Sequence, residues 1–408
     1  MAKDPASLHV LLIHQAYISL GEAGGTRHAE MADYLVQHGH RVTIIASPIS
    51  YLTGRERRRQ DASQTAGLTV LRAPALRSLH RSFFLRILNF FSFMVSSFFV
   101  GLRVRDVDLI WGTSPPLFQA FSAWLLARFK RVPFLFEVRD LWPDFAVAVG
   151  VLRNPALIAA SEWLERFLYS HADQLLINSP GFYEHVKQHG GRDIAIIPNG
   201  SDPSMFHPAA KGEHFRSTHS LQDKFVVLYA GAHGMSNDLG TLLKAAFLLK
   251  KKPNIAIVLL GDGKDKAALI QEAQDMDLFN VHFLPALPKS AMTDALAAAD
   301  ACLGILKKLD LYKTVYPNKV FDYMAAGRPI IIAIDGVIRQ VVEQAGAGIF
   351  SPPGDPEALA ESILSLAKKP AMSRKMGMAG RIYLESHFAR NDLAAQLLEL
   401  IQKNAATA

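Results

Sequence analysis

The sequence predicts an α/β protein of two doubly wound, Rossmann-like parallel-sheet domains that face a cleft. Short apolar runs of buried-strand type alternate with segments of helical spacing along the chain. The alternation is interrupted at Pro198–Pro203, where prolines, a glycine and polar residues break both helix and strand. The length of 408 residues agrees, because domains of about 150 residues give two to three. We therefore expect an N-terminal domain over 1–200 and a C-terminal domain over 201–387, with a last helix at about 388–408 that packs back on the first.

The individual strands are predicted by their apolar runs. A strand at 8–14, a helix through Met31 and Leu35, and a strand at 41–46 together make a right-handed parallel βαβ unit. Similar runs predict further strands of the first domain at 108–112, 132–138, 174–178 and 194–197. Those of the second domain are expected at 225–231, 255–260, 281–284, 301–304 and 329–333.

Composition narrows the class of protein. Half of the residues are apolar and a fifth are charged, which excludes a disordered or fibrous chain. The net charge of +7 suits an anionic partner, such as nucleotide phosphates, an acidic lipid surface or nucleic acid. The single cysteine, Cys302, cannot form an internal disulfide, and the first apolar run is a strand rather than a signal peptide. We therefore expect a cytoplasmic protein.

One segment, residues 83–105, does not fit a plain α/β pattern. Its central part, 87–102, carries no charge, and Arg103 and Arg105 follow it directly. On helical spacing Phe91 and Phe98 share an apolar face. Two interpretations are open: an interfacial helix that lies in a membrane surface, or a buried helix of the first domain. No uninterrupted run of 18 apolar residues is present, so a spanning helix is not expected.

Two glycine loops follow strands, where α/β proteins present ligand sites. Gly24, Gly25 and Thr26 open the first helix, so backbone amides and the positive helix end can face an anion. Gly261 and Gly263 are expected to present backbone amides to an anion in the same way in the second half. Neither loop is G-x-G-x-x-G or a Walker loop, which removes the main support for a nicotinamide dehydrogenase or a P-loop enzyme.

The stretch from Pro317 to Pro329 predicts a helix whose N-terminus can bind an anionic ligand. Gly327 ends this helix, and Lys319 lies in its first turn, where a helix N-terminus and a lysine suit a diphosphate. Asp322, three residues further on the same side, can accept hydrogen bonds from two vicinal ribose hydroxyls. The alternative is a Lys–Asp surface pair on an ordinary helix.

A charged cluster follows the strand at 132–138. The cluster directly follows an apolar strand and consists of Glu137, Arg139, Asp140 and Asp144. Charges in such a place are energetically costly unless they form ion pairs or take part in binding or catalysis. Asp140 can orient or deprotonate a hydroxyl, and Arg139 can hold an anionic group. The alternative is a structural ion pair.

No metal site is predicted. Asp106 and Asp108 spell D-x-D but precede their strand, at the wrong end of the sheet for a ligand. The fifteen histidines show no H-x-H or H-E-x-x-H spacing. A G-x-S-x-G nucleophile elbow is also absent from the sequence.

Taken in order, these pieces resemble a known family over nearly the whole chain. The motifs are Gly24–His28, Gly39–Thr43, Glu137–Pro143, Ile197–Gly200 with Asp202 and Phe206, Tyr229–Gly231, Gly261–Gly263, Pro317–Pro329 and Pro352–Pro356. They resemble glycosyltransferases of the GT-B fold, family 4, and especially the WbuB-like fucosaminyltransferases of O-antigen and capsule assembly.

The resemblance implies a retaining, metal-independent enzyme that takes a nucleotide sugar in the second domain and an acceptor in the first. Asp322 matches the acidic residue that binds the ribose, and the family's first glutamate falls on Thr314. The usual phosphate-binding Arg and Lys fall near His233 and Asn237, and Lys319 takes over their charge.

The expected activity is transfer of an N-acetylated hexosamine or deoxyhexosamine from a UDP-sugar to a polyprenyl-pyrophosphate-linked glycan, with no cofactor and no nucleic-acid partner. The catalytic candidates are Asp140, Arg139 and Lys319; the nucleotide-binding candidates are Gly24, Gly25, Thr26, His233, Gly261, Gly263, Asn318, Lys319 and Asp322. The enzyme is expected in lipopolysaccharide biosynthesis, peripheral on the inner face of the cell membrane. The alternatives are a UDP-sugar 2-epimerase of the same architecture and a non-catalytic membrane-bound scaffold.

Overall fold

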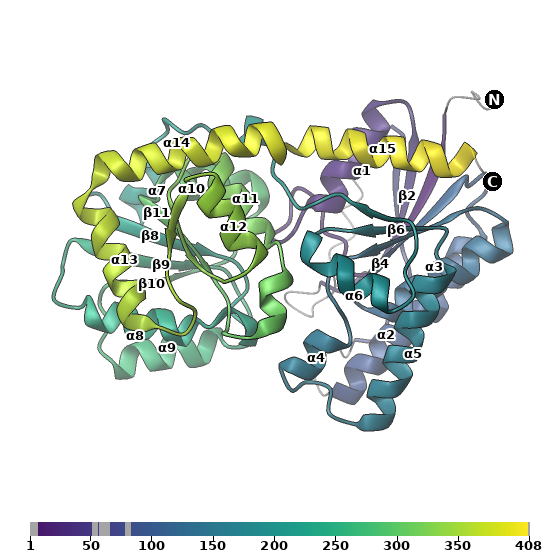
Figure 1. The fold of residues 1–408 in the computed structure, drawn as a ribbon, viewed down its shortest axis with the longest axis horizontal. Helices are drawn as coiled ribbons and strands as arrows, with labels where there is room; N and C mark the ends of the chain where they lie inside the picture. Colours follow the sequence, from purple (N-terminus) through teal and green to yellow (C-terminus); the bar gives the residue numbers. More distant parts are fainter. Residues whose placement is uncertain (1–6, 51–55, 57–65, 78–82, 407–408) are drawn as a thin grey trace. The chain divides into compact units, whose positions relative to one another are not determined.

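The computed structural model describes residues 7–50, 56, 66–77 and 83–406, which form two compact units (Figure 1). The first unit comprises Met1–Ser19, Thr26–Pro198 and Asn391–Ala408. The second comprises Leu20–Gly25 and Asn199–Arg390. The chain therefore passes from the first sheet to the second between Pro198 and Asn199, inside the segment that breaks the α/β alternation in the sequence.

The first unit is built on a seven-stranded parallel sheet in the order β3-β2-β1-β4-β5-β6-β7. Its strands are β1 His9–Ile13, β2 Arg41–Ala46, β3 Leu68–Arg72, β4 Leu109–Ser114, β5 Phe134–Val138, β6 Gln174–Ile177 and β7 Ile194–Ile196. The order reverses between β1 and β4, which makes their carboxyl ends the switch point of a doubly wound sheet.

Helices cover both faces of this sheet. They are α1 Arg27–Gln37, α2 Phe83–Leu102, α3 Leu117–Lys130, α4 Asp144–Ala148, α5 Pro155–His171, α6 Tyr183–Gln188 and α15 Arg390–Ala406, with a short 3₁₀ turn η2 at Pro180–Phe182. In Figure 1, α1 and α15 lie on one side of the sheet and α2, α3 and α5 on the other. Leu393, Leu397 and Ile401 of α15 belong to the same core cluster as α1 and the strands.

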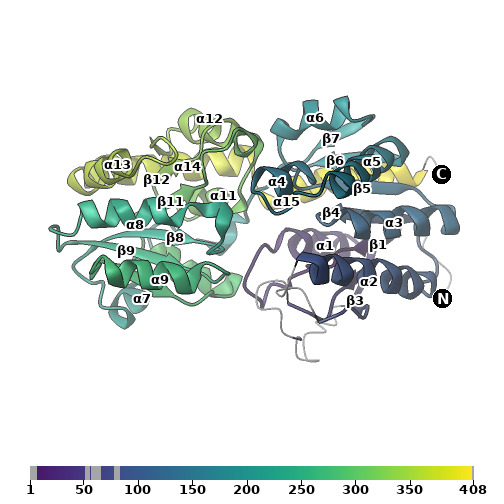
Figure 2. The same ribbon diagram turned by 90° about the horizontal axis from the view of Figure 1, so that it is seen from below.

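The second unit is a six-stranded parallel sheet in the order β10-β9-β8-β11-β12-β13 (Figure 2). Its strands are β8 Phe225–Ala230, β9 Ile255–Leu260, β10 Val281–Leu284, β11 Ala301–Ile305, β12 Ile330–Ala333 and β13 Gly348–Phe350. This order reverses between β8 and β11, so the carboxyl ends of these strands form the switch point of the second sheet.

Two separate apolar clusters fill the faces of the second sheet, one under α7, α10, α11, α12 and α14 and one under α8, α9 and α13. The helices are α7 Glu213–Thr218, α8 Leu239–Leu248, α9 Lys266–Asp275, α10 Met292–Ala297, α11 Asn318–Ala325, α12 Val337–Gln344, α13 Pro356–Lys368 and α14 Pro370–His387. Short 3₁₀ turns lie at η3 Pro203–Met205, η4 Met235–Asn237, η5 Lys289–Ala291 and η6 Asp310–Thr314.

The predicted fold class is confirmed, and each strand expected from the sequence is present. Two strands were not predicted: β3 and β13 are the outermost strands on one edge of each sheet. They have one neighbouring strand each, and their side chains are mostly half-buried. The helix expected after Pro317 is α11, and Gly327 just beyond it adopts the left-handed φ of +65° that commonly ends a helix.

Helix α2 turns its small and polar positions toward the protein. The buried side chains within residues 85–102 recur every four residues, at Asn89, Phe93, Ser97 and Gly101. Asn89 Oδ1 accepts a hydrogen bond of 2.8 Å from Gln15 Nε2, and the hydroxyls of Ser97 and Ser122 lie 3.0 Å apart. Polar contacts and the fully buried Phe93 together therefore fix α2 against the first unit.

The opposite face of α2 is apolar and points away from the core. Phe91, Val95 and Phe99 are 50%, 40% and 56% exposed. By length and composition α2 passes as a candidate membrane span over Leu85–Leu102, of which 22% is buried; no other helix in the described part of the chain does so. The interpretation of this segment as a buried core helix is wrong, because its apolar side faces outward.

Candidate functional site

In the second unit, the loops after β8 and β9 pack directly against each other. A Cβ atom on Gly261 would lie 1.8 Å from the carbonyl oxygen of Gly231, and one on Gly263 would lie 2.3 Å from that of His233. Both Gly261 and Gly263 also have φ angles near +155°, which L-residues rarely adopt. The two predicted glycines thus allow two loops to meet at the switch point of the sheet.

His233 is buried where these loops meet. Its backbone N–H donates to the carbonyl of Asp262 over 2.8 Å, and its side chain is 0% exposed. Neither ring nitrogen has a hydrogen-bond partner among the described residues. Burial, helped by Lys266, lowers the pKa of His233 to about 4, so the imidazole is neutral at pH 7. A neutral ring with an unsatisfied N–H is suited to donate to a ligand.

Lys319, in the first turn of α11, points to the carboxyl end of β8. Its Nζ donates to the hydroxyl of Tyr229 over 2.9 Å and lies 4.1 Å from the centre of that ring. A Cβ on Gly231 would lie 2.5 Å from Nζ, so glycine leaves room for the ammonium. Burial lowers the pKa of Lys319 to about 7. No carboxylate of the described residues lies within 4 Å of Nζ, which leaves the charge to an anionic ligand.

Asp322 has partners that the sequence did not reveal. Its Oδ1 accepts hydrogen bonds from Ser201 Oγ at 2.6 Å and from the nearly buried Lys289 Nζ at 2.5 Å. Within the described parts of the chain, Oδ2 has no such partner. The alternative of a Lys319–Asp322 surface pair does not hold, because the two side chains have different partners. We expected Asp322 to accept hydrogen bonds from two ribose hydroxyls; Oδ1 already has two protein donors, and Oδ2 remains for a ligand.

The remaining nucleotide-binding candidates have different surroundings. Asn318 Oδ1 accepts a 3.2 Å hydrogen bond from Arg390, whose guanidinium also donates to the carbonyl of Gly200. Gly24 has a φ of +138°, and a Cβ on Gly25 would meet no atom within 4 Å. Thr26 precedes α1, and its hydroxyl donates to Glu30. The space beside Gly25 is therefore open, whereas Asn318 has a structural contact.

In the first unit, Glu137 is the structural member of the charged cluster after β5. It is fully buried and accepts hydrogen bonds from Arg27 Nε at 2.9 Å, His28 Nε2 at 2.7 Å and Trp111 Nε1 at 3.1 Å. Burial opposes its ionisation, but the contacts with His28 and Arg27 hold the pKa of Glu137 well below its usual range. Arg27 also donates to the carbonyls of Ile197 and Pro198.

Arg139 and Asp140, the predicted catalytic pair, lie beyond the end of β5. Arg139 Nη1 lies 3.2 Å from His14 Nε2; since arginine only donates, this nitrogen accepts and Nδ1 of His14 carries the proton. That Nδ1 lies 3.1 Å from Thr113 Oγ1. The sequence analysis did not identify His14, although it directly follows β1 at the switch point.

Asp140 is half-buried, and its carboxylate has no hydrogen-bond or ion-pair partner among the residues that the structure describes. Burial raises the pKa of Asp140 to about 6, against the opposing charge of Arg139. A carboxyl group that titrates near neutral pH at the end of a strand is a candidate general base or acid. By contrast, Asp108 accepts the His9 N–H at 2.7 Å, so the D-x-D aspartate is structural.

The topology of the two sheets defines the GT-B class, and solved structures agree. Sucrose-phosphate synthase from Thermosynechococcus elongatus superposes with a TM-score of 0.79 at 18% identity, over 98% of this chain and 100% of that one. Anabaena Alr3699/HepE, solved with UDP and glucose, gives a TM-score of 0.74 at 16% identity, over 97% and 100% of the two chains.

The chain belongs to the glycosyltransferases. Residues 23–200 match the Glycosyl transferase 4-like domain, and residues 210–383 match the Glycosyl transferases group 1 domain. A curated relative, the putative colanic acid biosynthesis glycosyl transferase WcaI of Escherichia coli, is 26% identical over 395 residues, which cover 91% of this chain and 94% of that protein.

Proposed function

We propose that this glycosyltransferase moves a sugar, with retention of configuration, from a UDP-sugar to a polyprenyl-pyrophosphate-linked glycan during surface polysaccharide assembly. The observation that carries the proposal is the half-buried ammonium of Lys319, which has no carboxylate partner among the described residues, on the same helix as Asp322. The colanic acid relative supports the pathway class, and the UDP and glucose bound to HepE support the donor class. The resemblance to WbuB-like enzymes favours an N-acetylated hexosamine or deoxyhexosamine.

The donor nucleotide is assigned to the second unit. The N-terminus of α11 and Lys319 supply positive charge for a diphosphate, which stabilises the leaving group without a metal ion. Oδ2 of Asp322 accepts one ribose hydroxyl, while Lys289 and Ser201 hold this carboxylate in its orientation. His233 supplies a neutral N–H donor at the base of the glycine loops.

The acceptor is assigned to the first unit. In retaining chemistry of this kind the leaving phosphate takes the proton of the attacking hydroxyl on the same face, so no enzyme nucleophile is needed. Asp140 orients that hydroxyl, and Arg139, positioned by His14, holds an anionic group of the acceptor.

Calorimetry with UDP and with uridine tests the donor site. Lys319→Ala should weaken UDP binding and leave uridine binding nearly unchanged, because only UDP carries the diphosphate. Asp322→Ala should weaken both ligands. Lys313→Ala, a change at a half-exposed lysine six residues earlier, is the control. Unchanged UDP affinity in both Lys319→Ala and Asp322→Ala would contradict the assignment of these residues to the donor nucleotide site.

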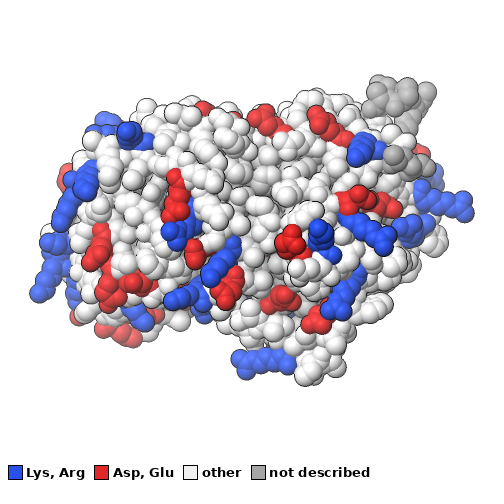
Figure 3. Space-filling model, in the orientation of Figure 1, with Lys and Arg blue, Asp and Glu red and all other residues white. Residues whose placement is uncertain are grey.

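A product assay separates transfer from the alternatives. The protein is incubated with UDP-N-acetylhexosamines, with and without a polyprenyl-pyrophosphoryl sugar. Glycosylated lipid supports the proposal, and an epimer formed without acceptor supports a UDP-sugar 2-epimerase. Nucleotide binding without either product supports a scaffold. Acidic and basic side chains are interspersed on the face shown in Figure 3, which gives no continuous basic area there for a nucleic acid.

We also propose that the first unit binds the inner membrane surface through an aromatic surface. This surface comprises Phe91, Val95 and Phe99 of α2, Phe129 of α3 and Trp163 of α5. Helix α3 contacts both α2 and α5, and Phe129 and Trp163 are 70% and 63% exposed. The exposed Arg103, Arg105 and Arg131 at the ends of these helices suit anionic lipids. The helix lies on the bilayer in this proposal, since its polar face is engaged by the protein.

Sedimentation with anionic liposomes tests the membrane proposal. The wild type should sediment and be released by high salt, while a Phe91→Ser/Phe99→Ser variant should stay in the supernatant. Both side chains are half-exposed, so their loss leaves the core intact. Phe247→Ser/Phe279→Ser removes two equally exposed rings from the second unit and should sediment like the wild type. A wild type that stays in the supernatant contradicts the proposal.

A further inference from the structure

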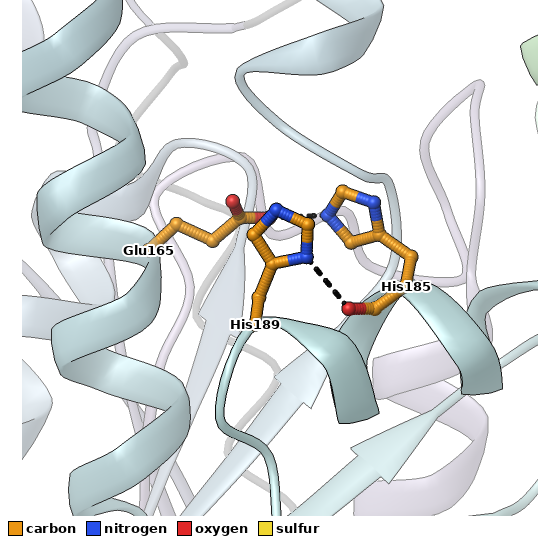
Figure 4. A group of neighbouring side chains, drawn as sticks. All are labelled: Glu165, His185 and His189. Atoms are coloured by element: carbon orange, nitrogen blue, oxygen red, sulfur yellow. Dashed lines mark hydrogen bonds and ion pairs between the residues drawn. The ribbon is translucent and has the colours of Figure 1, made fainter.

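Three metal-ligating side chains meet in the first unit, away from the groups assigned above. Glu165 comes from α5, His185 from α6, and His189 directly follows α6 (Figure 4). One ligand atom from each lies within 4.8 Å of the other two. His185 Nε2 is 2.9 Å from Glu165 Oε1. The histidine spacings considered in the sequence did not reveal this group, because its carboxylate is contributed by another helix.

Glu165 is a buried carboxylate whose charge is incompletely compensated. The residue is 0% exposed, and its Oε1 accepts a 2.9 Å hydrogen bond from the hydroxyl of Tyr169 besides the contact with His185. Its other oxygen, Oε2, is buried and has no hydrogen-bond partner in the described part of the chain. Among the described residues His185 is its only ion-pair partner. A buried anion of this kind is costly unless a cation is bound beside it.

The rings of His185 and His189 stack, with centroids 4.0 Å apart and 17° between their planes, so one ring must turn before both can coordinate the same ion. His189 Nδ1 lies 2.8 Å from the backbone carbonyl of His185, which fixes its proton on Nδ1 and leaves Nε2 free to coordinate. When His185 coordinates through Nε2, its Nδ1–H faces Asp144 Oδ2, 3.6 Å away. A backbone carbonyl is an outer contact that commonly holds a ligating imidazole in place, and the Asp144 carboxylate lies just beyond hydrogen-bond distance of the other ring.

We propose that Glu165, His185 and His189 bind one divalent transition-metal ion, with Zn²⁺ the best match. Two imidazole nitrogens and one carboxylate oxygen suit Zn²⁺, whereas Mg²⁺ and Ca²⁺ take oxygen ligands. Both histidine side chains are half-buried, which leaves a fourth position to water.

The ion ties α5 to α6 and, through Asp144, to the start of α4. Its three ligands all belong to the first unit and do not include Asp140, so its role is to stabilise the first unit. All four tryptophans, at 111, 124, 142 and 163, belong to this unit, so tryptophan fluorescence follows its unfolding. Zn²⁺ should raise its unfolding midpoint in proportion to the logarithm of free metal above the dissociation constant.

The test uses the full chain, freed of any affinity tag and of metal, and titrated with Zn²⁺ by calorimetry and with Co²⁺ by visible absorption. The wild type should bind one ion per chain and show the absorption bands of four-coordinate Co²⁺. Asp144→Asn should lower the affinity about 10–100-fold, because it removes only the outer contact to His185. His189→Gln should lower it further, because it removes a ligand.

His38→Gln is the matched control. His38 also places Nδ1 2.8 Å from a backbone carbonyl four residues earlier, but it belongs to no such group of ligands among the described residues. This variant should bind Zn²⁺ like the wild type. A wild type that takes up no Zn²⁺ would mean that Glu165 and His185 form an ordinary ion pair and would overturn the proposal. Equal affinity in the wild type and His189→Gln would overturn it as well.

Discussion

Replacing Asp140 by asparagine should stabilise the first unit while it impairs turnover. Asp140 has a pKa of about 6 in the folded protein because burial disfavours its charge, against an ordinary value of 3.8 for an aspartate. Between these values the native state binds more protons than the unfolded state, so stability falls as pH rises. Above pH 6 the full penalty is present, about 3 kcal/mol at most at 1.36 kcal/mol per pKa unit. The asparagine side chain does not titrate and avoids this penalty.

Tryptophan fluorescence during thermal unfolding measures this effect in the first unit alone. At pH 7.5 the variant should unfold up to about 6–12 °C higher, since 1 kcal/mol shifts the midpoint by about 2–4 °C in a unit of this size. At pH 5 the gain should fall to about half of its value at pH 7.5. The same variant should bind UDP normally and turn over slowly.

The control is Asp106→Asn, which makes the same charge change at an exposed position of the same unit. Asp106 has a φ of +54°, a conformation that asparagine tolerates well. Its midpoint should stay close to the wild type at both pH values. If Asp140→Asn gains no stability at pH 7.5, or gains equally at pH 5, burial does not govern this carboxyl group. Loss of UDP binding with an intact fold would remove its acceptor role.

Three further predictions concern the donor lysine, the glycine loop of the second unit and the buried charge of the first. At pH 8, UDP binding should be accompanied by uptake of a proton, because the pKa of Lys319 in the free site is about 7 and a bound anion raises this pKa. Calorimetry in buffers of different ionisation enthalpy detects the uptake. Lys319→Met should abolish it. Gly261→Ala should destabilise the second unit by more than about 2 kcal/mol in circular-dichroism melts, because its Cβ would meet a backbone oxygen at 1.8 Å; Gly25→Ala, with open space, should melt like the wild type. Glu137→Gln should cost about 3–5 kcal/mol in fluorescence-monitored unfolding, because it removes the negative partner of a buried guanidinium; a loss below about 1 kcal/mol would contradict that pairing.

The sequence predicts the fold well because buried parallel strands are continuous apolar runs. The two strands that were not predicted show the limit of this signal. Only one residue of β3, Leu68, is buried, and β13 has three residues, all half-buried. An edge strand with one neighbour needs little apolar sequence, so its pattern is close to that of a loop.

The candidate site is predicted only where its residues are close in sequence. Lys319 and Asp322 share one helix, so their spacing was informative. Ser201 and Lys289 reach Asp322 from 121 and 33 residues away, and no local pattern connects them with it. His14 is a single polar residue after an apolar strand. Its contact with Arg139 depends on how the strands before these two residues, β1 and β5, are arranged in the sheet. A single sequence does not reveal this arrangement.

The arginine contacts on either side of the passage between the sheets confine the freedom of that connection. The guanidinium of Arg27 holds the carbonyls of Ile197 and Pro198 within the first unit, and that of Arg390 holds the carbonyl of Gly200 within the second. Only Asn199 lies between the residues held in this way. The two arginines therefore fix the backbone on both sides of this one-residue connection.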